Sequence, residues 1–217
     1  MISMITFVLE QLKRYSLKEK DLGAFAKINK NGMHFKIRVF DVEKLGNLSI
    51  VEMNAMLGLM KMETIVLTPL EVDMPLFSFD GIRAMGSSTL LLELYDTQLQ
   101  PYDCSAFEAI KDKYAHLPDR QTEPRWYDPL HLPGTLSKKG RNISAGLEAL
   151  EKEFMSAYMQ AIPGAAPCSR EQKQAKVYDY ADKLVKLGGP AIDQFKKMIG
   201  EEEAALLFKK YIFGAQD

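Results

Sequence analysis

Three apolar, strand-like stretches follow one another between residues 63 and 95, and the breaks between them are too short to contain a helix. The stretches are 63–68, 75–83 and 89–95. The breaks contain proline or glycine, which end strands and form turns. Because a parallel pair needs a crossover of about a dozen residues or more, these connections predict antiparallel neighbours in one sheet.

The sheet extends toward the N-terminus. Residues 24–28 and 34–40 alternate apolar and polar side chains on either side of Asn29-Lys-Asn-Gly32. Asn-Gly between two such runs is the strongest short signal for a β-hairpin. Residues 46–60 fit both a helical stripe and a strand, so their type stays open. Residues 90–94 are apolar on both faces of the pleat except at Glu93. This pattern indicates a sheet that is covered on both sides.

The rest of the chain has helical patterns. A helix is expected at the start, where apolar residues recur between residues 5 and 12, and further helices are expected at 104–115, 146–161, 170–187, 190–198 and 200–213. A segment rich in proline, glycine and charge spans 117–146 and is expected to be a long connection without regular structure. We therefore predict one domain, 1–217, with a sheet-rich part at 20–100 and a helical half at 101–217. Its fold is a three-layer α/β/α sandwich around a mostly antiparallel sheet.

Composition excludes several kinds of protein. Lys and Arg number 28 against 29 Asp and Glu, and this net charge of -1 argues against a global affinity for nucleic acid or an anionic membrane, although a local patch remains possible. Cys104 and Cys168 are far apart, and the three histidines have no ligand spacing, so no metal site is expected. Without a leader or a membrane-spanning run, the chain is expected to be cytoplasmic.

The order of several motifs resembles a known family. Thr64-Ile-Val-Leu-Thr-Pro69, Asp73-Met-Pro-Leu-Phe-Ser-Phe-Asp80 and Leu90-Leu-Leu-Glu-Leu-Tyr-Asp96 are similar to the central pattern of the ferredoxin-dependent bilin reductases. The closing segments Glu153-Phe-Met-Ser-Ala-Tyr-Met159, Val177-Tyr-Asp-Tyr180, Gly200-Glu-Glu-Glu203 and Tyr211-Ile-Phe213 follow the family's last helices in order. The resemblance covers roughly residues 35–214 of the chain. The red chlorophyll catabolite reductases are the sister group with the same fold.

The resemblance implies that a linear tetrapyrrole lies between the sheet and the C-terminal helices. Such enzymes take single electrons from ferredoxin, hold no metal or flavin of their own, and supply protons from the protein. Asp80 stands in the position of the family's proton-donating aspartate, and Ser78 shares its face of the strand. The alternative is a structural carboxylate near a strand end, bonded to backbone or to Arg83.

A second catalytic position departs from the family. Where biliverdin-reducing members have a histidine on the preceding strand, a count without gaps gives Glu63. A glutamate facing Asp80 would form a carboxylate dyad that shares a proton. The alternative is a solvated residue at the start of a strand.

The long segment supplies the remaining candidates. His131 is either a proton relay or a surface residue. Trp126 and Tyr127 either stack on a flat ligand or anchor the loop. Lys138, Lys139 and Arg141 either hold ligand carboxylates, face an acidic ferredoxin, or form a solvated cluster.

Three functions follow from these residues. The first is reduction of a bilin with ferredoxin as partner. The second is a tetrapyrrole carrier that does not reduce its ligand, and the third is an unrelated small-molecule enzyme or an interaction module on the same fold.

Overall fold

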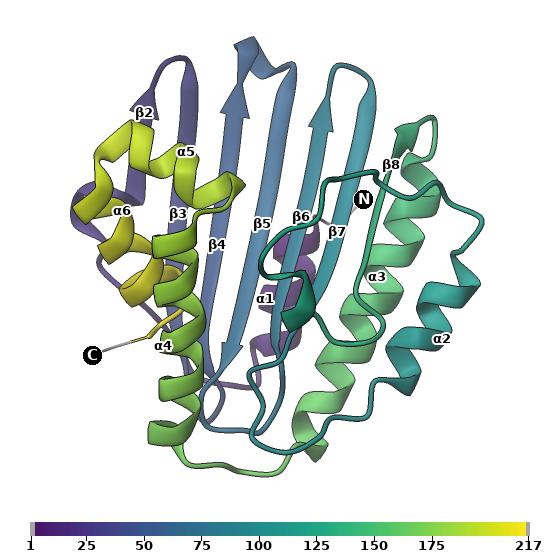
Figure 1. The fold of residues 1–217 in the computed structure, drawn as a ribbon, viewed down its shortest axis with the longest axis vertical. Coiled ribbons are helices and arrows are strands. Elements are labelled where there is room, and N and C mark those ends of the chain that lie inside the picture. Colours follow the sequence, from purple (N-terminus) through teal and green to yellow (C-terminus); the bar gives the residue numbers. More distant parts are fainter. Residues whose placement is uncertain (1–2, 216–217) are drawn as a thin grey trace.

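Eight strands form one antiparallel sheet in the computed structural model, which describes residues 3–215 (Figure 1). The strand order is β1-β3-β4-β5-β6-β7-β8, and β2 also pairs with β3. Every pair of neighbours is antiparallel, as the short connections predict. The strands are β1 (Leu17–Glu19), β2 (Lys27–Lys30), β3 (Met33–Val42), β4 (Gly46–Ala55), β5 (Met60–Pro69), β6 (Leu76–Ala84), β7 (Ser87–Tyr95) and β8 (Leu136–Arg141).

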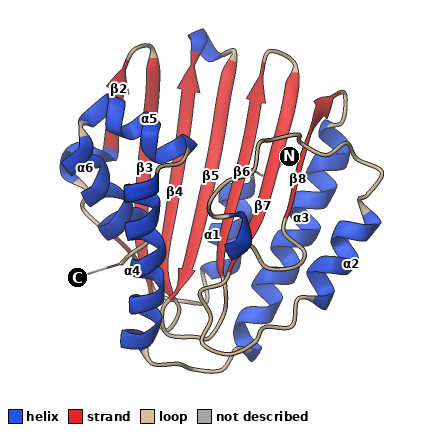
Figure 2. Cartoon of the chain, viewed as in Figure 1, coloured by secondary structure: helices blue, strands red, loops and turns tan. Residues whose placement is uncertain are grey.

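Helices cover both faces of this sheet, which confirms the predicted three-layer α/β/α sandwich (Figure 2). The first three helices lie on one face, and the last three lie on the other. The helices are α1 (Met4–Leu12), α2 (Ser105–Lys113), α3 (Ser144–Ala161), α4 (Arg170–Leu187), α5 (Pro190–Ile199) and α6 (Glu201–Leu206). Within residues 3–215, no helix is both long and apolar enough to cross a membrane.

The alternation of side chains along the strands creates two separate cores. Leu90 and Leu92 of β7 point toward α1, α2 and α3, where they join a core that contains Phe77 and Phe154. The opposite face contributes to a second core with α4, α5 and α6. Strands that are apolar on both faces need cover on both sides, because each exposed face would otherwise leave a large apolar area in water.

Several elements of the sequence analysis are confirmed and others need correction. The hairpin at Asn31-Gly32 is present, and both residues have positive φ, 54° and 72°, as a tight hairpin turn requires. The ambiguous region 46–60 is mainly a strand, β4. The segment 117–146 is not continuous loop, because it contains the edge strand β8. The last expected helix, 200–213, is split into α6 and a π-helical stretch, Leu207–Ile212.

Candidate functional site

A cavity of about 390 Å³ lies between the sheet and the C-terminal helices. Its floor is the face of β3 to β7 that looks toward α4 and α5, and the segment 120–127 contributes to its wall. Much of the lining is apolar and includes Phe35, Met53, Met62 and Phe195. Ligand sites commonly have this character, with volumes of roughly 300–1,000 Å³ and a few polar groups among apolar walls.

The register of the strands gathers four polar side chains in the floor of this cavity. Thr64 of β5 pairs with Asp80 of β6, and Ser78 of β6 pairs with Glu93 of β7. Side chains directly opposite each other, or two residues apart, lie on the same face of a sheet. All four of these residues line the cavity, so the strand pairing alone fixes their grouping.

Asp80 is a carboxylic acid in a poorly solvated position. The surface that it retains faces the cavity, and the Thr64 hydroxyl donates a hydrogen bond to its carboxylate. Burial raises the pKa of Asp80, while the hydrogen bond from Thr64 and the charge of Arg120 act in the opposite direction. Burial disfavours the charged form of an acid, so Asp80 holds its proton at a higher pH than a solvated aspartate does.

Glu93 is a second acid on the same face. Burial, reinforced by the charge of Asp80, raises the pKa of Glu93 to about 7, against the opposing effects of the Tyr95 hydrogen bond and of Arg125 and Arg120. The Tyr95 hydroxyl donates to Glu93 Oε2 at 2.8 Å. A carboxyl group with a pKa near neutrality is suited to accept and to release a proton under physiological conditions.

His131 lies next to Glu93 and outside the cavity lining. Its backbone forms an isolated bridge with Tyr95, and its ring meets the Tyr95 ring at 4.8 Å in an edge-on contact. His131 Nε2 is 4.0 Å from Glu93 Oε1 and is buried without a hydrogen-bond partner among the described residues. Burial lowers the pKa of His131, Asp128 opposes this effect and Arg125 adds to it. Burial therefore favours the neutral form of the ring.

Two arginines give the cavity positive charge. Arg120 and Arg125 both line it, and the Arg125 guanidinium donates a hydrogen bond to the Tyr127 hydroxyl. Tyr127 also lines the cavity, whereas Trp126 does not. Trp126 Nε1 donates to the Gly188 carbonyl at 2.8 Å, so this indole fastens the loop to the end of α4. A guanidinium pairs well with the carboxylate of a ligand because it presents two parallel donors.

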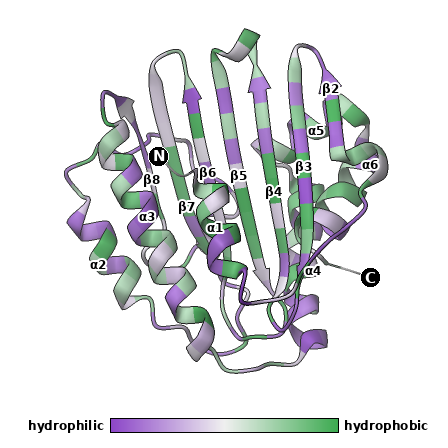
Figure 3. Cartoon of the chain, turned by 180° about the vertical axis from the view of Figure 1, so that it is seen from behind, coloured by the Kyte–Doolittle hydropathy of each residue, from purple (hydrophilic) through white to green (hydrophobic). Residues whose placement is uncertain are grey.

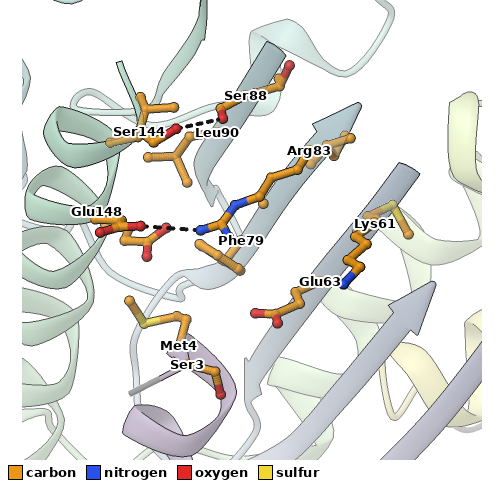
Figure 4. Close-up of a pocket in the computed structure, with 16 residues that line it drawn as sticks. Ser3, Met4, Lys61, Glu63, Phe79, Arg83, Ser88, Leu90, Ser144 and Glu148 are labelled. Atoms are coloured by element: carbon orange, nitrogen blue, oxygen red, sulfur yellow. Dashed lines mark hydrogen bonds and ion pairs between the residues drawn. The ribbon is translucent and has the colours of Figure 1, made fainter. Parts of the chain in front are cut away.

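Glu63 lies on the other face of the sheet. It pairs with Gly81, not with Asp80, and it lines a separate cavity of about 260 Å³ between the sheet and helices α1 and α3 (Figure 4). There it lies among Arg83 and Glu148, which form an ion pair at 3.3 Å. The predicted dyad of Glu63 and Asp80 is therefore not formed, because neighbouring residues of a strand point to opposite faces.

The basic run on β8 also lies away from the cavity. Lys138 is buried, and its Nζ donates to the Leu117 carbonyl at 2.9 Å and to Asp119 at 2.7 Å. Lys139 and Arg141 are exposed on this edge strand. None of the three lines the cavity, and the cations that do are Arg120 and Arg125.

Side chains that could bind a metal ion do not cluster within residues 3–215. Residues 3–215 contain no group of three or more His, Cys, Asp or Glu side chains arranged to hold a metal ion. Cys104 and Cys168 are both free thiols. The polar side chains that line the cavity are those of Thr64, Ser78, Asp80, Glu93, Tyr95, Arg120, Arg125, Tyr127, Tyr180 and Gln194.

Sequence reasoning identified Asp80, Ser78 and Tyr127 as candidates, and all three line the cavity. It missed Glu93, Thr64 and the two arginines. Glu93 did carry a signal, because it is the one charged residue within an otherwise apolar strand. Arg120 and Arg125 carried no such signal, because they lie in a loop and side-chain periodicity does not predict the path of a loop.

Comparison with known proteins gives a match in fold. No protein-family model matches the sequence, and no curated protein is similar enough to count as a relative. Among solved structures, the crystal structure of phytochromobilin synthase from tomato in complex with biliverdin is similar, with a TM-score of 0.70 and 14% sequence identity. The similarity covers 98% of this chain and 83% of that chain. The two proteins share an architecture along nearly the whole of the present chain.

Proposed function

We propose that this protein binds a linear tetrapyrrole in the cavity and reduces it with electrons from ferredoxin or a similar one-electron carrier. The observation that carries the proposal is the presence of two acids with raised pKa values, Asp80 and Glu93, in the floor of a largely apolar cavity. The sequence resemblance to bilin reductases, and the shared fold with a protein that holds biliverdin, support this ligand class.

The cavity has the groups that such a ligand needs. Phe35 and Phe195 offer apolar surfaces for the pyrrole rings, and aromatic side chains bind flat ligands through large contact areas. Arg120 and Arg125 would pair with the carboxylates of the ligand. They take the role that the sequence alone had suggested for the basic run on β8.

The chemistry balances with an external electron carrier. Reduction of one double bond consumes two electrons and two protons. The first electron converts the ligand into a radical anion, and Asp80 transfers its carboxyl proton to a carbon of that radical. The second electron arrives from a second carrier molecule, and Glu93 supplies the second proton. His131, whose Nε2 is 4.0 Å from Glu93 Oε1, would return protons to Glu93 from outside the cavity.

A carrier protein without reductase activity is the second candidate. The observation that favours it is Thr64, because the group that contacts Asp80 from the neighbouring strand is a hydroxyl. An aliphatic hydroxyl does not ionise near neutral pH, so Thr64 adds no second acid at that position. The ligand would still bind, because binding needs no proton donor there.

The test is an anaerobic absorbance titration with biliverdin, followed by addition of reduced ferredoxin. We expect a saturable change in the bilin spectrum and then a second change on reduction. In Asp80→Asn, binding should persist while turnover falls by about 100-fold or more, the usual effect of removing a general acid. The matched control is Asp96→Asn, which alters an exposed aspartate at the end of β7 and should behave as wild type.

Two outcomes would contradict the reductase. If wild-type protein binds biliverdin and no low-potential donor changes its spectrum, the carrier is the correct function. If neither biliverdin nor another linear tetrapyrrole binds at stoichiometric concentrations, the similarity extends to the fold alone, and Asp80 has a structural role.

A further inference from the structure

Four large apolar side chains are exposed at two neighbouring hairpin tips. Met56, Leu57 and Leu59 lie in the turn between β4 and β5, and Met85 lies in the turn between β6 and β7. Leu57 is fully exposed, and each of the others is exposed by more than half. The Met85 N–H donates to the Leu59 carbonyl at 3.3 Å, so the two tips are adjacent. We call these four residues the tip patch.

The tip patch projects from the end of the sheet. In Figure 1 the β4–β5 turn stands above the helices on both faces, and Figure 3 shows this tip from behind in the colour of hydrophobic residues. The geometry of these turns does not favour large apolar side chains. Met56, Leu57 and Met85 have φ values of 52°, 55° and 50°, in the left-handed region that favours Gly and Asn. The β2–β3 turn of the same sheet uses Asn31-Gly32 for this purpose.

Positive charge surrounds the tip patch. The three rungs of the sheet nearest these turns, with the turns themselves, contain five cations and no Asp or Glu. The cations are Lys30, Lys61, Arg83, Lys139 and Arg141. Arg83 is paired with Glu148, whereas Lys61, Lys139 and Arg141 make no ion pair with any residue in the described part of the chain. This is a local excess in a chain whose net charge is -1.

The opposite end of the sheet has no such excess. Its turns and strand ends carry Glu43, Glu71, Asp73 and Asp96, and cations of α4 pair with three of these acids, as Arg170–Glu71, Lys173–Asp73 and Lys176–Asp96. Of the two ends, the one that bears the tip patch is therefore the apolar and basic end. A charged planar surface would orient such a molecule with the basic end toward a negative charge.

We propose that the basic end of the sheet docks on an anionic lipid surface. The apolar tips would enter the interface between headgroups and acyl chains, and the cations would lie at the level of the lipid phosphates. Interfacial anchors combine these two features. A stable protein–protein interface covers roughly 800 Å² on each partner. Four side chains on projecting turns offer no such broad surface, but they can insert into a lipid interface, so a lipid surface is the better match. This inference goes beyond the proposed function and does not depend on it.

The tip patch adjoins the cavity described above. Met60, Met62 and Ile82, which follow the tips along the same strands, belong to the cavity lining. A protein docked through its tips would thus present this end of the cavity toward the membrane. An apolar ligand that partitions into lipid would have a short path between the two.

The test is co-sedimentation of the ligand-free protein with vesicles of phosphatidylcholine, with and without about a third of phosphatidylglycerol. We expect binding to the anionic vesicles that weakens between about 0.1 M and about 1 M salt, because salt screens the cations. The double variant Leu57→Asn and Met85→Asn should bind at least about tenfold more weakly, since it loses the inserted apolar groups. Asparagine tolerates left-handed φ, so these changes preserve the turns.

The matched control is Leu187→Asn, which removes an exposed leucine from the end of α4 and should bind as wild type. Absence of binding to the anionic vesicles, or equal binding by wild type and the double variant, would overturn the proposal. Concentration-dependent self-association that the double variant abolishes would also overturn it, because the tip patch would then contact a second copy.

Discussion

On the face of the sheet that α3 covers, Phe77 packs against the rings of Phe154 and Tyr158, whereas on the other face Asp80 and Glu93 look into a cavity. Both faces belong to the same strands, and residues that alternate along β6 and β7 serve one face or the other. The filled face, which α3 covers, packs large rings around Phe77, and the hollow face, which looks toward α4 and α5, leaves the two acids beside the large cavity. Close packing beneath a candidate site suits a site whose groups must be held in place.

The two faces also differ in the groups that lie next to their acids. Asp80 and Glu93 receive hydrogen bonds from the hydroxyls of Thr64 and Tyr95. Near Glu63, on the filled face, Arg83 forms an ion pair with Glu148. A donated hydrogen bond and a nearby cation both favour the charged carboxylate, but burial outweighs them for Asp80 and Glu93 and raises both pKa values. Burial also raises the pKa of Glu63, so the acids of the hollow face are set apart by their position beside the large cavity.

The largest expected effect contrasts the packing of the two faces. Phe77→Ala should lower the free energy of unfolding by about 3–5 kcal/mol, because it removes a fully buried ring from a filled core. Phe195→Ala should cost at least about 1 kcal/mol less, since part of the Phe195 ring borders the cavity and lacks contact atoms there. Urea unfolding of the ligand-free protein measures both. Equal losses would show that the cavity is closed in solution.

The next effect concerns pH and contrasts Glu93 with Glu151. Burial raises the pKa of both to about 7, and Glu151 lies in the smaller cavity on the filled face. The unfolded value is about 4.3, so the folded protein retains these protons longer than the unfolded chain. The stability from each group is complete below about pH 4.3 and is lost as the pH rises to about 7.

Glutamine substitution should remove this dependence. Relative to wild type, Glu93→Gln should gain stability between pH 5 and pH 8, by up to about 3 kcal/mol. Glu151→Gln should gain a similar amount, because burial raises its pKa to the same value. Urea unfolding at the two pH values measures both gains, and the exposed Glu108→Gln serves as the control. A gain in one variant and none in the other would show that burial raises the pKa on one face of the sheet only.

Much of the architecture was readable because it depends on local pattern. Periodicity or turn residues predict the Asn31-Gly32 turn, the strands around Asp80 and the six helices. Strand β8 was missed because Leu136 is its one large apolar side chain, and its pairing with β7 is made through the backbone. An edge strand of this composition leaves no alternating signal.

The site was readable only in part, because it depends on register. Asp80 was found through the sequence resemblance, but the position opposite it was assigned by counting residues without gaps. That count gave Glu63, whereas the observed partner is Thr64. A shift of one residue moves a side chain to the other face of the sheet. Register between strands is set by turns and by packing on both faces, and neither is visible in one strand alone.

The smallest expected effect tests that single residue of register. Glu63→Gln should leave biliverdin binding and turnover within about twofold of wild type, because Glu63 lies on the face that does not line the large cavity. Thr64→Val removes the hydrogen bond that lowers the pKa of Asp80, so the pKa of Asp80 should rise. The carboxyl band of Asp80 in infrared difference spectra, identified through Asp80→Asn, reports this shift without reference to activity. If Glu63→Gln moved that band and Thr64→Val did not, the two residues would have exchanged faces, and the carboxylate dyad would be real.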